Sequence, residues 1–328
     1  MIEWRRSRLA PWLSAFAVLI AADVAGAQTD SYPSRPVRLI VPFAAGGLND
    51  VVARLVAPYL ERSLGQPFII DNRPAASGIV GTDATAKATP DGYTLLMVAS
   101  SFTVIPATHQ KVPYDAQRDL APIVMVAKNS LLFLVNPKVP AKSLAEFVAL
   151  SKADPGKFNY ASPGAATQTH LVVELFSQKA GIKMQHIPYR GGAPAMTAMV
   201  GGETQFTAIS TLLSLPQIQN GVLRAIASGS LTRDPQLPDL PTVAEQGFPG
   251  FEAIQWIGLL TTAGTPDEII ERLNAEINRA LRDPDLIAKF AQQGISPAGG
   301  TPAEFQHTIA ADLKNWNETA RAANIRAE

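Results

Sequence analysis

From residue 37 onward, short apolar runs alternate with segments in which apolar residues recur every three or four positions. Runs of the first kind predict buried strands, and spacing of the second kind predicts amphipathic helices. We expect strands at residues 37–42, 68–71, 94–99, 159–161, 206–209, 225–228 and 251–261. Residues 120–135 are nearly all apolar and predict two strands, or one long strand with a break. The alternation of strands and helices predicts an α/β fold.

Residues at the expected helix ends predict where individual helices begin, bend or end. Asn49 or Asp50 is expected to cap the helix after the first strand, and Pro58 to kink that helix or end it early. Ser143 with Glu146 predicts a capping box for a later helix. Two helices are expected to finish the chain. Each should begin with a threonine N-cap, a proline and a glutamate three positions after the cap, at residues 265–268 and 301–304.

The first 27 residues have the three parts of a secretory signal peptide. A basic start with arginines at 5, 6 and 8 is followed by apolar residues 9–22 and by a small-residue cleavage site at 25–27. The apolar run is shorter than the roughly 20 residues that cross a bilayer, which disfavours a membrane anchor. We therefore expect cleavage near Ala27 and a periplasmic location. The arginine pair leaves both the general secretory route and twin-arginine export open.

Charge and cysteine content exclude several classes of function. The 328 residues carry 28 basic and 28 acidic side chains, so the formal net charge is zero. Nucleic-acid binding needs a basic surface, so a chain of zero net charge is not expected to bind nucleic acid. The chain has no cysteine and four scattered histidines, so neither a disulfide framework nor a metal site is expected, and no cofactor is predicted. The length allows one large domain or two of medium size.

Two glycine loops are the strongest candidates for a binding site. Residues 42–50 read PFAAGGLND and residues 162–170 read SPGAATQTH, and each segment links a predicted strand to a predicted helix. Such a loop exposes backbone N–H groups at the positive end of a helix, which suits a carboxylate or a phosphate. The alternative is an ordinary turn that needs glycine for its dihedral angles.

Three further side chains are candidates beside these loops. Ser100 and Ser101 follow the predicted strand at 94–99, and open α/β sheets bind ligands at the carboxyl ends of their strands. The two serines are either hydroxyl contacts for a ligand or ordinary helix caps. His170 lies in the first turn of a predicted helix, where it either contacts a ligand or has a structural role.

A series of short motifs runs along the mature chain. They are Tyr32-Pro33, residues 36–43 (PVRLIVPF), Gly46-Gly47 with Asp50, Asn72-Arg73-Pro74, residues 90–95 (PDGYTL), Pro113-Tyr114-Asp115, Ser162-Pro163-Gly164 with Thr167 and His170, Pro188-Tyr189-x-Gly191-Gly192, Gly201-Gly202 and Gly264-Thr265-Pro266. Each motif alone is weak, but the ordered set is specific. In this order the chain resembles the Bug/TctC family, the extracytoplasmic solute receptors of tripartite tricarboxylate transporters.

The resemblance implies a type II periplasmic-binding-protein fold, an α/β fold in which two domains joined by crossing strands close on the ligand like a clamp. One domain would comprise residues 28–125 plus 256–328 and the other residues 126–255, after a signal peptide at 1–27. The crossings are expected near residues 123–126 and 251–258. The implied function is capture of a small carboxylate for the membrane subunits of a tripartite transporter. We expect a monomer without enzymatic activity.

Family members hold a carboxylate between the two glycine loops, with ordered water often bridging it to the first. Carried over, this puts one lip of the site at Phe43, Ala44, Gly46, Gly47, Asn49 and Asp50. The other lip comprises Ser162, Gly164, Ala165, Ala166, Thr167 and His170, and the expected set is completed by Ser100, Ser101, Tyr189 and Ile209. Two helix N-termini then face one carboxylate, each contributing about 0.3–1 kcal/mol. No arginine needs to reach the anion.

Departures from the family pattern narrow the class of ligand that we expect. Ala44-Ala45 stand where prolines are common, and Ala165-Ala166 where Asn and Gly are common. Ile209 stands near a position where the family often has an acidic residue that meets a ligand amino group. An ammonium without a partner is costly to bury. We therefore expect an aromatic or aliphatic carboxylic acid without an amine.

Two other functions match parts of the pattern. A sensor domain would bind the same ligand and report to a signalling partner, and its sequence would look the same. An exported serine hydrolase would use Ser162 or Ser100 with His170. The chain has neither a Gly-x-Ser-x-Gly motif nor a motif that supplies an orienting acid, which disfavours the hydrolase.

Overall fold

Strands and helices alternate along the chain in the computed structural model, as the hydrophobic pattern predicts. The structure describes Met1 and residues 32–327, apart from residues 44, 75–77, 190 and 235. Tyr32–Glu328 forms one compact unit, which is described here by itself. The signal peptide predicted at residues 1–27 lies outside the described residues, except for Met1. In the described part, no helix has the length and apolar character needed to cross a membrane.

One group of strands runs in the order β2-β1-β3-β9-β4, with β10 also paired to β4. β1 is parallel to β2 and β3, whereas β9 is antiparallel to β3 and β4. The bounds are β1 (Val37–Val41), β2 (Phe68–Asn72), β3 (Thr94–Ala99), β4 (Leu120–Val135), β9 (Ile254–Thr262) and β10 (Ser296–Gly299). The parallel strands alternate with helices, as expected for βαβ units.

A second group continues the sheet in the order β4-β7-β5-β6, and β8 pairs with β4. β5 is parallel to β6 and β7, whereas β4 is antiparallel to β7 and β8. The bounds are β5 (Asn159–Ser162), β6 (Gln185–Pro188), β7 (Phe206–Ser210) and β8 (Arg224–Ser228).

β4 belongs to both groups. Residues from Leu120 to Ser130 pair with β9. Leu131 to Val135 pair with β7, and Leu132 to Val135 also pair with β8. Residues 120–135 are therefore one unbroken strand, and the predicted break is wrong. The polar Lys128, Asn129 and Ser130 instead lie where the strand passes from one group to the other.

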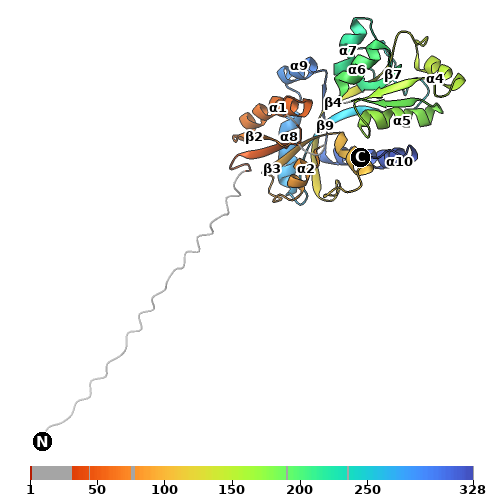
Figure 1. Cartoon of the computed structure of the whole chain (residues 1–328). Coiled ribbons are helices and arrows are strands. Elements are labelled where there is room, and N and C mark those ends of the chain that lie inside the picture. The colour runs from red at the N-terminus through yellow and green to blue at the C-terminus, as the bar shows by residue number, and fades with distance from the viewer. Residues whose placement is uncertain (2–31, 44, 75–77, 190, 235, 328) are drawn as a thin grey trace. The chain divides into compact units, whose positions relative to one another are not determined.

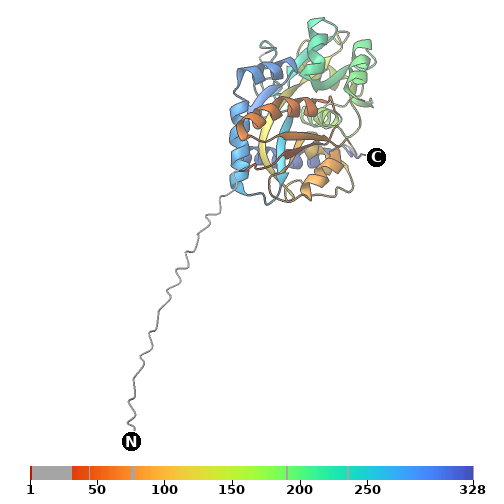
Figure 2. The same ribbon diagram turned by 90° about the vertical axis from the view of Figure 1, so that its left-hand side faces the viewer.

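The helices cover both groups of strands. Figures 1 and 2 show α1, α8 and α9 beside the first group, and Figure 1 shows α4, α5, α6 and α7 around the second. The bounds are α1 (Leu48–Leu64), α2 (Ile79–Ala86), α3 (Ser101–Thr108), α4 (Leu144–Ala153), α5 (Gln168–Ala180), α6 (Gly192–Gly201), α7 (Thr211–Gln219), α8 (Asp267–Ala280), α9 (Pro284–Gln292) and α10 (Pro302–Ala322).

The start predicted for α1 and its early end at Pro58 are wrong, while the kink given as the alternative at Pro58 stays a prediction. The helix begins at Leu48, so Gly47 is its N-cap and Asn49 and Asp50 lie inside its first turn. The helix also does not end at Pro58 but continues to Leu64. Its buried face packs into the core of the first group, and this burial outweighs the one backbone hydrogen bond that proline removes.

The other cap predictions have mixed outcomes. Thr301 makes the expected capping box with Glu304. Ser143 accepts a bond from Glu146 N, but the Glu146 carboxylate accepts from Lys142 N, so only half of that box forms. The N-cap of α8 is Pro266 instead of Thr265. Three helices, not two, finish the described chain, because α9 begins after Asp283.

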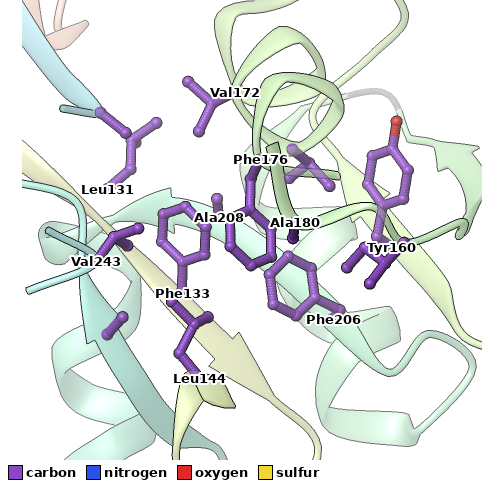
Figure 3. Packing of buried hydrophobic residues seen from close by; sticks show 14 of the residues in the cluster. Leu131, Phe133, Leu144, Tyr160, Val172, Phe176, Ala180, Phe206, Ala208 and Val243 are labelled. Atoms are coloured by element: carbon purple, nitrogen blue, oxygen red, sulfur yellow. The ribbon is translucent and has the colours of Figure 1, made fainter. Parts of the chain in front are cut away.

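Each group of strands has its own apolar core. In the second group, Phe133 of β4 meets Phe176 of α5 and Phe206 of β7 edge-on, with ring centroids 5.2 and 5.8 Å away (Figure 3). α10 joins both groups, since its Phe305 packs beside Trp256 while its Trp316 lies in the cluster of Phe176. The division at residues 28–125 plus 256–328 and 126–255 remains a prediction.

Candidate functional site

A cavity of about 520 Å³ lies between the starts of three helices and the two longest strands. Its volume is in the range of sites for small organic molecules. The cavity is lined by Leu48, Asn49, Ala99, Ser100, Ser101, Val104, Ile105, His109, Ala127, Lys128, Asn129, Pro163, Ala165, Ala166, Thr167, Gln168, Thr169, Gln255, Trp256, Ile257, Ile295 and Ala327.

The N-termini of α1, α3 and α5 all meet this cavity. The N-caps of α1 and α3, Gly47 and Ser100, make no side-chain capping bond. In α1, the N–H of Val51 is bonded to Gly47 O within the helix at 2.9 Å, while the first-turn N–H groups before it have no partner inside the helix. α5 differs, because the Thr167 side chain accepts a bond from His170 N. Free N–H groups at helix starts form a ready site for an anion.

β4 and β9 supply the base of the cavity. Ala127 lies opposite Ile257, and Asn129 lies opposite Gln255, in the antiparallel ladder. Directly opposite residues project from the same face of a sheet, and residues two apart share a face. These four side chains therefore form one mixed polar and apolar surface. Lys128 lies opposite Trp256 in the same ladder, and both residues also line the cavity.

Negative side chains are missing from the described part of the cavity wall. None of the described residues that line it is Asp or Glu. Carboxylates do lie nearby, but on other surfaces. The Asp312 carboxylate accepts a bond from Trp256 Nε1 at 2.8 Å, and it lines a separate cavity beside α10. The electrostatic character of the site therefore comes from helix N-termini, neutral polar groups and Lys128.

Asp50 organises the first glycine loop. Its buried carboxylate accepts bonds from Gly46 N at 2.8 Å, Arg54 Nε at 2.8 Å and Asn72 Nδ2 at 2.9 Å. Burial alone would raise the pKa of this carboxyl, but these three bonds outweigh it and hold the pKa below the usual value. Asp50 thus fixes the loop that leads into α1.

Two stacked histidines support the second glycine loop. The rings of His170 and His186 lie 3.7 Å apart. His170 Nδ1 accepts a bond from Ala166 N at 3.1 Å, and His186 Nε2 is 2.6 Å from Ser162 Oγ. Burial lowers the pKa of His170 to about 3, with His186 adding to the effect, and burial lowers the pKa of His186 to about 4. Both rings are neutral at neutral pH, so they shape the loop and bring no charge.

A buried hydrogen-bond chain joins the start of α3 to the start of α5. Ser100 Oγ donates to Gln168 Oε1 at 2.6 Å, and Gln168 Nε2 donates to Ile254 O at 2.7 Å. Gln168 therefore links an element of the first strand group to the second glycine loop and to β9. This contact explains how residues 68 positions apart come to line one cavity.

Six of the predicted site residues line the cavity: Asn49, Ser100, Ser101, Ala165, Ala166 and Thr167. Nine others do not line it: Phe43, Gly46, Gly47, Asp50, Ser162, Gly164, His170, Tyr189 and Ile209. Tyr189 and Ile209 pack in an apolar cluster of the second strand group, and Phe43 packs against the core of the first. Ala44 lies outside the described residues.

The sequence reasoning missed several lining residues, above all Asn129, Gln168 and Gln255. A signal for Asn129 existed, because Lys128, Asn129 and Ser130 interrupt an otherwise apolar segment. The roles of Gln168 and Gln255 depend on strand pairing and on contacts between distant segments. His186, which supports the second loop, was missed for the same reason.

The arrangement does not support a serine hydrolase. Ser162 is fully buried and does not line the cavity. Its partner is His186, and in the part of the chain that the structure describes neither His186 nor His170 is hydrogen-bonded to a carboxylate. A triad would need such an acid to orient the base.

Comparison with known proteins gives matches along nearly the whole chain. The family model of TctC, the tripartite tricarboxylate transporter family receptor, matches residues 52–325. Protein BugT of Bordetella pertussis is 39% identical over 311 residues, which are 94% of this chain and 95% of BugT.

Two similar solved structures contain a ligand. A protein of R. palustris solved with adipate is 31% identical, with a TM-score of 0.74 and coverage of 90% of this chain and 99% of that chain. MatC from Rhodopseudomonas palustris, solved with bound malate, is 29% identical, with a TM-score of 0.70 and coverage of 88% and 99%.

Proposed function

The chain belongs to the TctC family of tripartite tricarboxylate transporter receptors, and from this we propose that it captures a small carboxylic acid without an amine in the cavity at the starts of α1, α3 and α5. Solute binding, not catalysis, is the activity of this receptor family. The observation that carries the proposal is the meeting of three helix N-termini at a cavity whose described lining residues include no Asp or Glu.

A carboxylate suits this site electrostatically. Each helix N-terminus contributes about 0.3–1 kcal/mol toward an anion in an exposed setting. The contribution grows when the cavity is closed to water, because the local dielectric constant falls. Backbone N–H groups also bind a carboxylate directionally, which a distant cation would not do.

An amine on the ligand would find no counter-charge on the described wall of the cavity. No Asp or Glu is among the described lining residues, and the neutral amides and hydroxyls of the wall cannot neutralise an ammonium. The relatives solved with adipate and malate carry ligands that are carboxylates without amines. Both observations favour the same class of ligand for this chain.

The proposal includes export and delivery. The chain is exported by the signal at residues 1–27, binds its ligand in the periplasm as a monomer and docks in its closed form on the membrane subunits of a tripartite transporter. Closure takes place about β4 and β9, which run along the base of the cavity.

Isothermal titration with ligand pairs that differ by one ammonium group tests the ligand class. The pairs are succinate and aspartate, glutarate and glutamate, and adipate and 2-aminoadipate. We expect the amine-free member of at least one pair to bind at least tenfold more tightly than its amino partner, because the ammonium is buried without a counter-charge. Tight binding of aspartate or glutamate, with no binding of any amine-free acid, would overturn the proposal.

A further inference from the structure

Asn129 lies on the base of the cavity where β4 passes between the two strand groups. The residue is 6% exposed. Neither amide atom, Nδ2 or Oδ1, has a hydrogen-bond partner among the described residues, and each has almost no surface accessible to water, whether in the cavity or outside it. Buried polar groups in folded proteins are nearly always bonded, so a fully unpaired amide beside a binding cavity indicates a missing partner.

Asn49, which lines the cavity at the start of α1, has one unpaired amide atom instead of two. It is 7% exposed, and its Nδ2 is also without a partner in the described part of the chain. A lone N–H donor beside a helix N-terminus needs only an acceptor, and a carboxylate oxygen supplies one. Asn49 therefore suits the carboxylate end of the ligand.

Asn129 needs a partner that both accepts and donates. An ionised carboxylate only accepts, so it would leave Oδ1 facing another acceptor. An ammonium only donates, so it would leave Nδ2 unpaired. A hydroxyl or a carboxamide can satisfy both atoms. Exchanging the positions of Nδ2 and Oδ1 does not alter this requirement, because the Asn129 amide still presents one donor and one acceptor without a partner.

We propose that the ligand is a carboxylic acid with a second, uncharged polar group, a hydroxyl or a carboxamide, and that Asn129 recognises that group. The inference rests on the proposed function, since it assigns the far end of the same ligand. The Asn129 amide reaches the group by turning about χ2, which is a soft torsion in asparagine. Asn129 then determines which carboxylic acids the receptor accepts.

Titration calorimetry with two ligand series tests the assignment. One series is butanoate, 4-hydroxybutanoate, succinamate and succinate, and the other is hexanoate, 6-hydroxyhexanoate, adipamate and adipate. Each series changes only the far end, from methyl to hydroxyl, carboxamide and carboxylate. We expect the hydroxyl or carboxamide member of at least one series to bind at least tenfold more tightly than the methyl and carboxylate members, because only it completes both bonds of Asn129.

Variants of Asn129 test whether this residue, and not the rest of the site, determines the preference among ligands. Asn129→Leu keeps the size of the side chain and should bring all members of a series within about threefold of each other, mainly by weakening the preferred one. Asn129→Ala should give the same loss of preference if the leucine variant does not fold. Asn220→Leu, at an exposed position after α7, should leave the preference intact.

The outcomes distinguish this inference from the proposed function. If no acid of either series or of the ammonium pairs binds the wild-type receptor, the proposed function fails. If plain acids bind as tightly as hydroxylated and amidated ones, water satisfies Asn129 and only this inference fails. A preference that survives both Asn129 variants would also overturn it.

Discussion

His170 and His186 show how single residues shape the site without touching the ligand cavity. Their stacked rings hold Ala166 N and Ser162 Oγ, and both rings stay uncharged because burial lowers their pKa values to about 3 and about 4. In the unfolded chain, each histidine takes up a proton near pH 6.5. As the pH falls below that value, the unfolded state binds protons that the folded state does not.

The free energy of unfolding should therefore fall between pH 7.0 and pH 5.0. The slope reaches about 1.4 kcal/mol per pH unit for each proton taken up on unfolding. With allowance for solvent screening of the pair, we expect a loss of about 1–2 kcal/mol over this range. Urea unfolding at several pH values measures it. His186→Gln should flatten the dependence, and His307→Gln, at an exposed position of α10, should not.

Asp312 should have the opposite effect on the free energy of unfolding over the same pH range. Burial raises its carboxyl pKa to about 6, and the nearby Glu252 adds to this, against the bonds from Trp256 and Thr103. The folded state thus gains a proton earlier than the unfolded state as the pH falls, which stabilises it. Asp312→Asn should make the loss between pH 7.0 and pH 5.0 steeper than in the wild type. An unchanged slope in this variant and in His186→Gln would contradict both assignments.

At the scale of residues, sequence reasoning predicted the candidate site in part. Asn49, Ser100, Ser101 and the alanines of the second loop do line the cavity, because their place at a helix start follows from local sequence. The partner of Ser162 could not be predicted, since His186 reaches it only through the parallel pairing of β5 and β6.

At the scale of elements, the start of α1 is the feature on which the proposed carboxylate capture depends. Gly47 has φ −72° and ψ 164°, which any residue can adopt, so a side chain there brings no backbone strain. A large side chain at this N-cap would cover the free N–H groups beside Leu48 and Asn49.

Gly47→Leu should therefore weaken binding of an accepted acid at least tenfold while the protein stays folded. We expect its free energy of unfolding to change by no more than about 1 kcal/mol, the usual range for an N-cap change. Gly201→Leu is the matched control, because no atom lies within 4 Å of a Cβ added there. Calorimetry and thermal melts give both readouts. Unchanged affinity in Gly47→Leu would remove the α1 N-terminus from the site.

The strands and most helices could be predicted because their hydrophobic periods are clear. α9 was missed although its signal was present, since Asp283 caps it and Pro284 occupies its first position. The course of β4 could not be predicted, because an apolar run of 16 residues fits one strand or two. Only pairing with β9 at one end and with β7 and β8 at the other settles it.

At the scale of the whole Tyr32–Glu328 unit, several elements connect the two groups of strands. β4 runs through both, β9 lies beside it, and α10 contributes Phe305 to one core and Trp316 to the other. The bonds from Ser100 to Gln168 and on to Ile254 O add a link at the cavity. A rotation of one group against the other must therefore bend β4 and β9 and re-form the bonds of Gln168. In the proposed mechanism, a ligand shifts the equilibrium between open and closed forms only by its greater affinity for the closed form.

Pairs of spin labels can measure that rotation directly. The chain has no cysteine, so labels attach only where cysteines are introduced. Glu61→Cys on α1 and Asn220→Cys after α7 place exposed labels on different groups of strands. In the proposed mechanism a ligand held by α1 and α5 favours the closed form, so an accepted acid should shorten the distance between these labels. Glu61→Cys with Lys111→Cys, both on the first group, should show no change. Equal distances with and without a ligand that binds by calorimetry would rule out closure about β4 and β9.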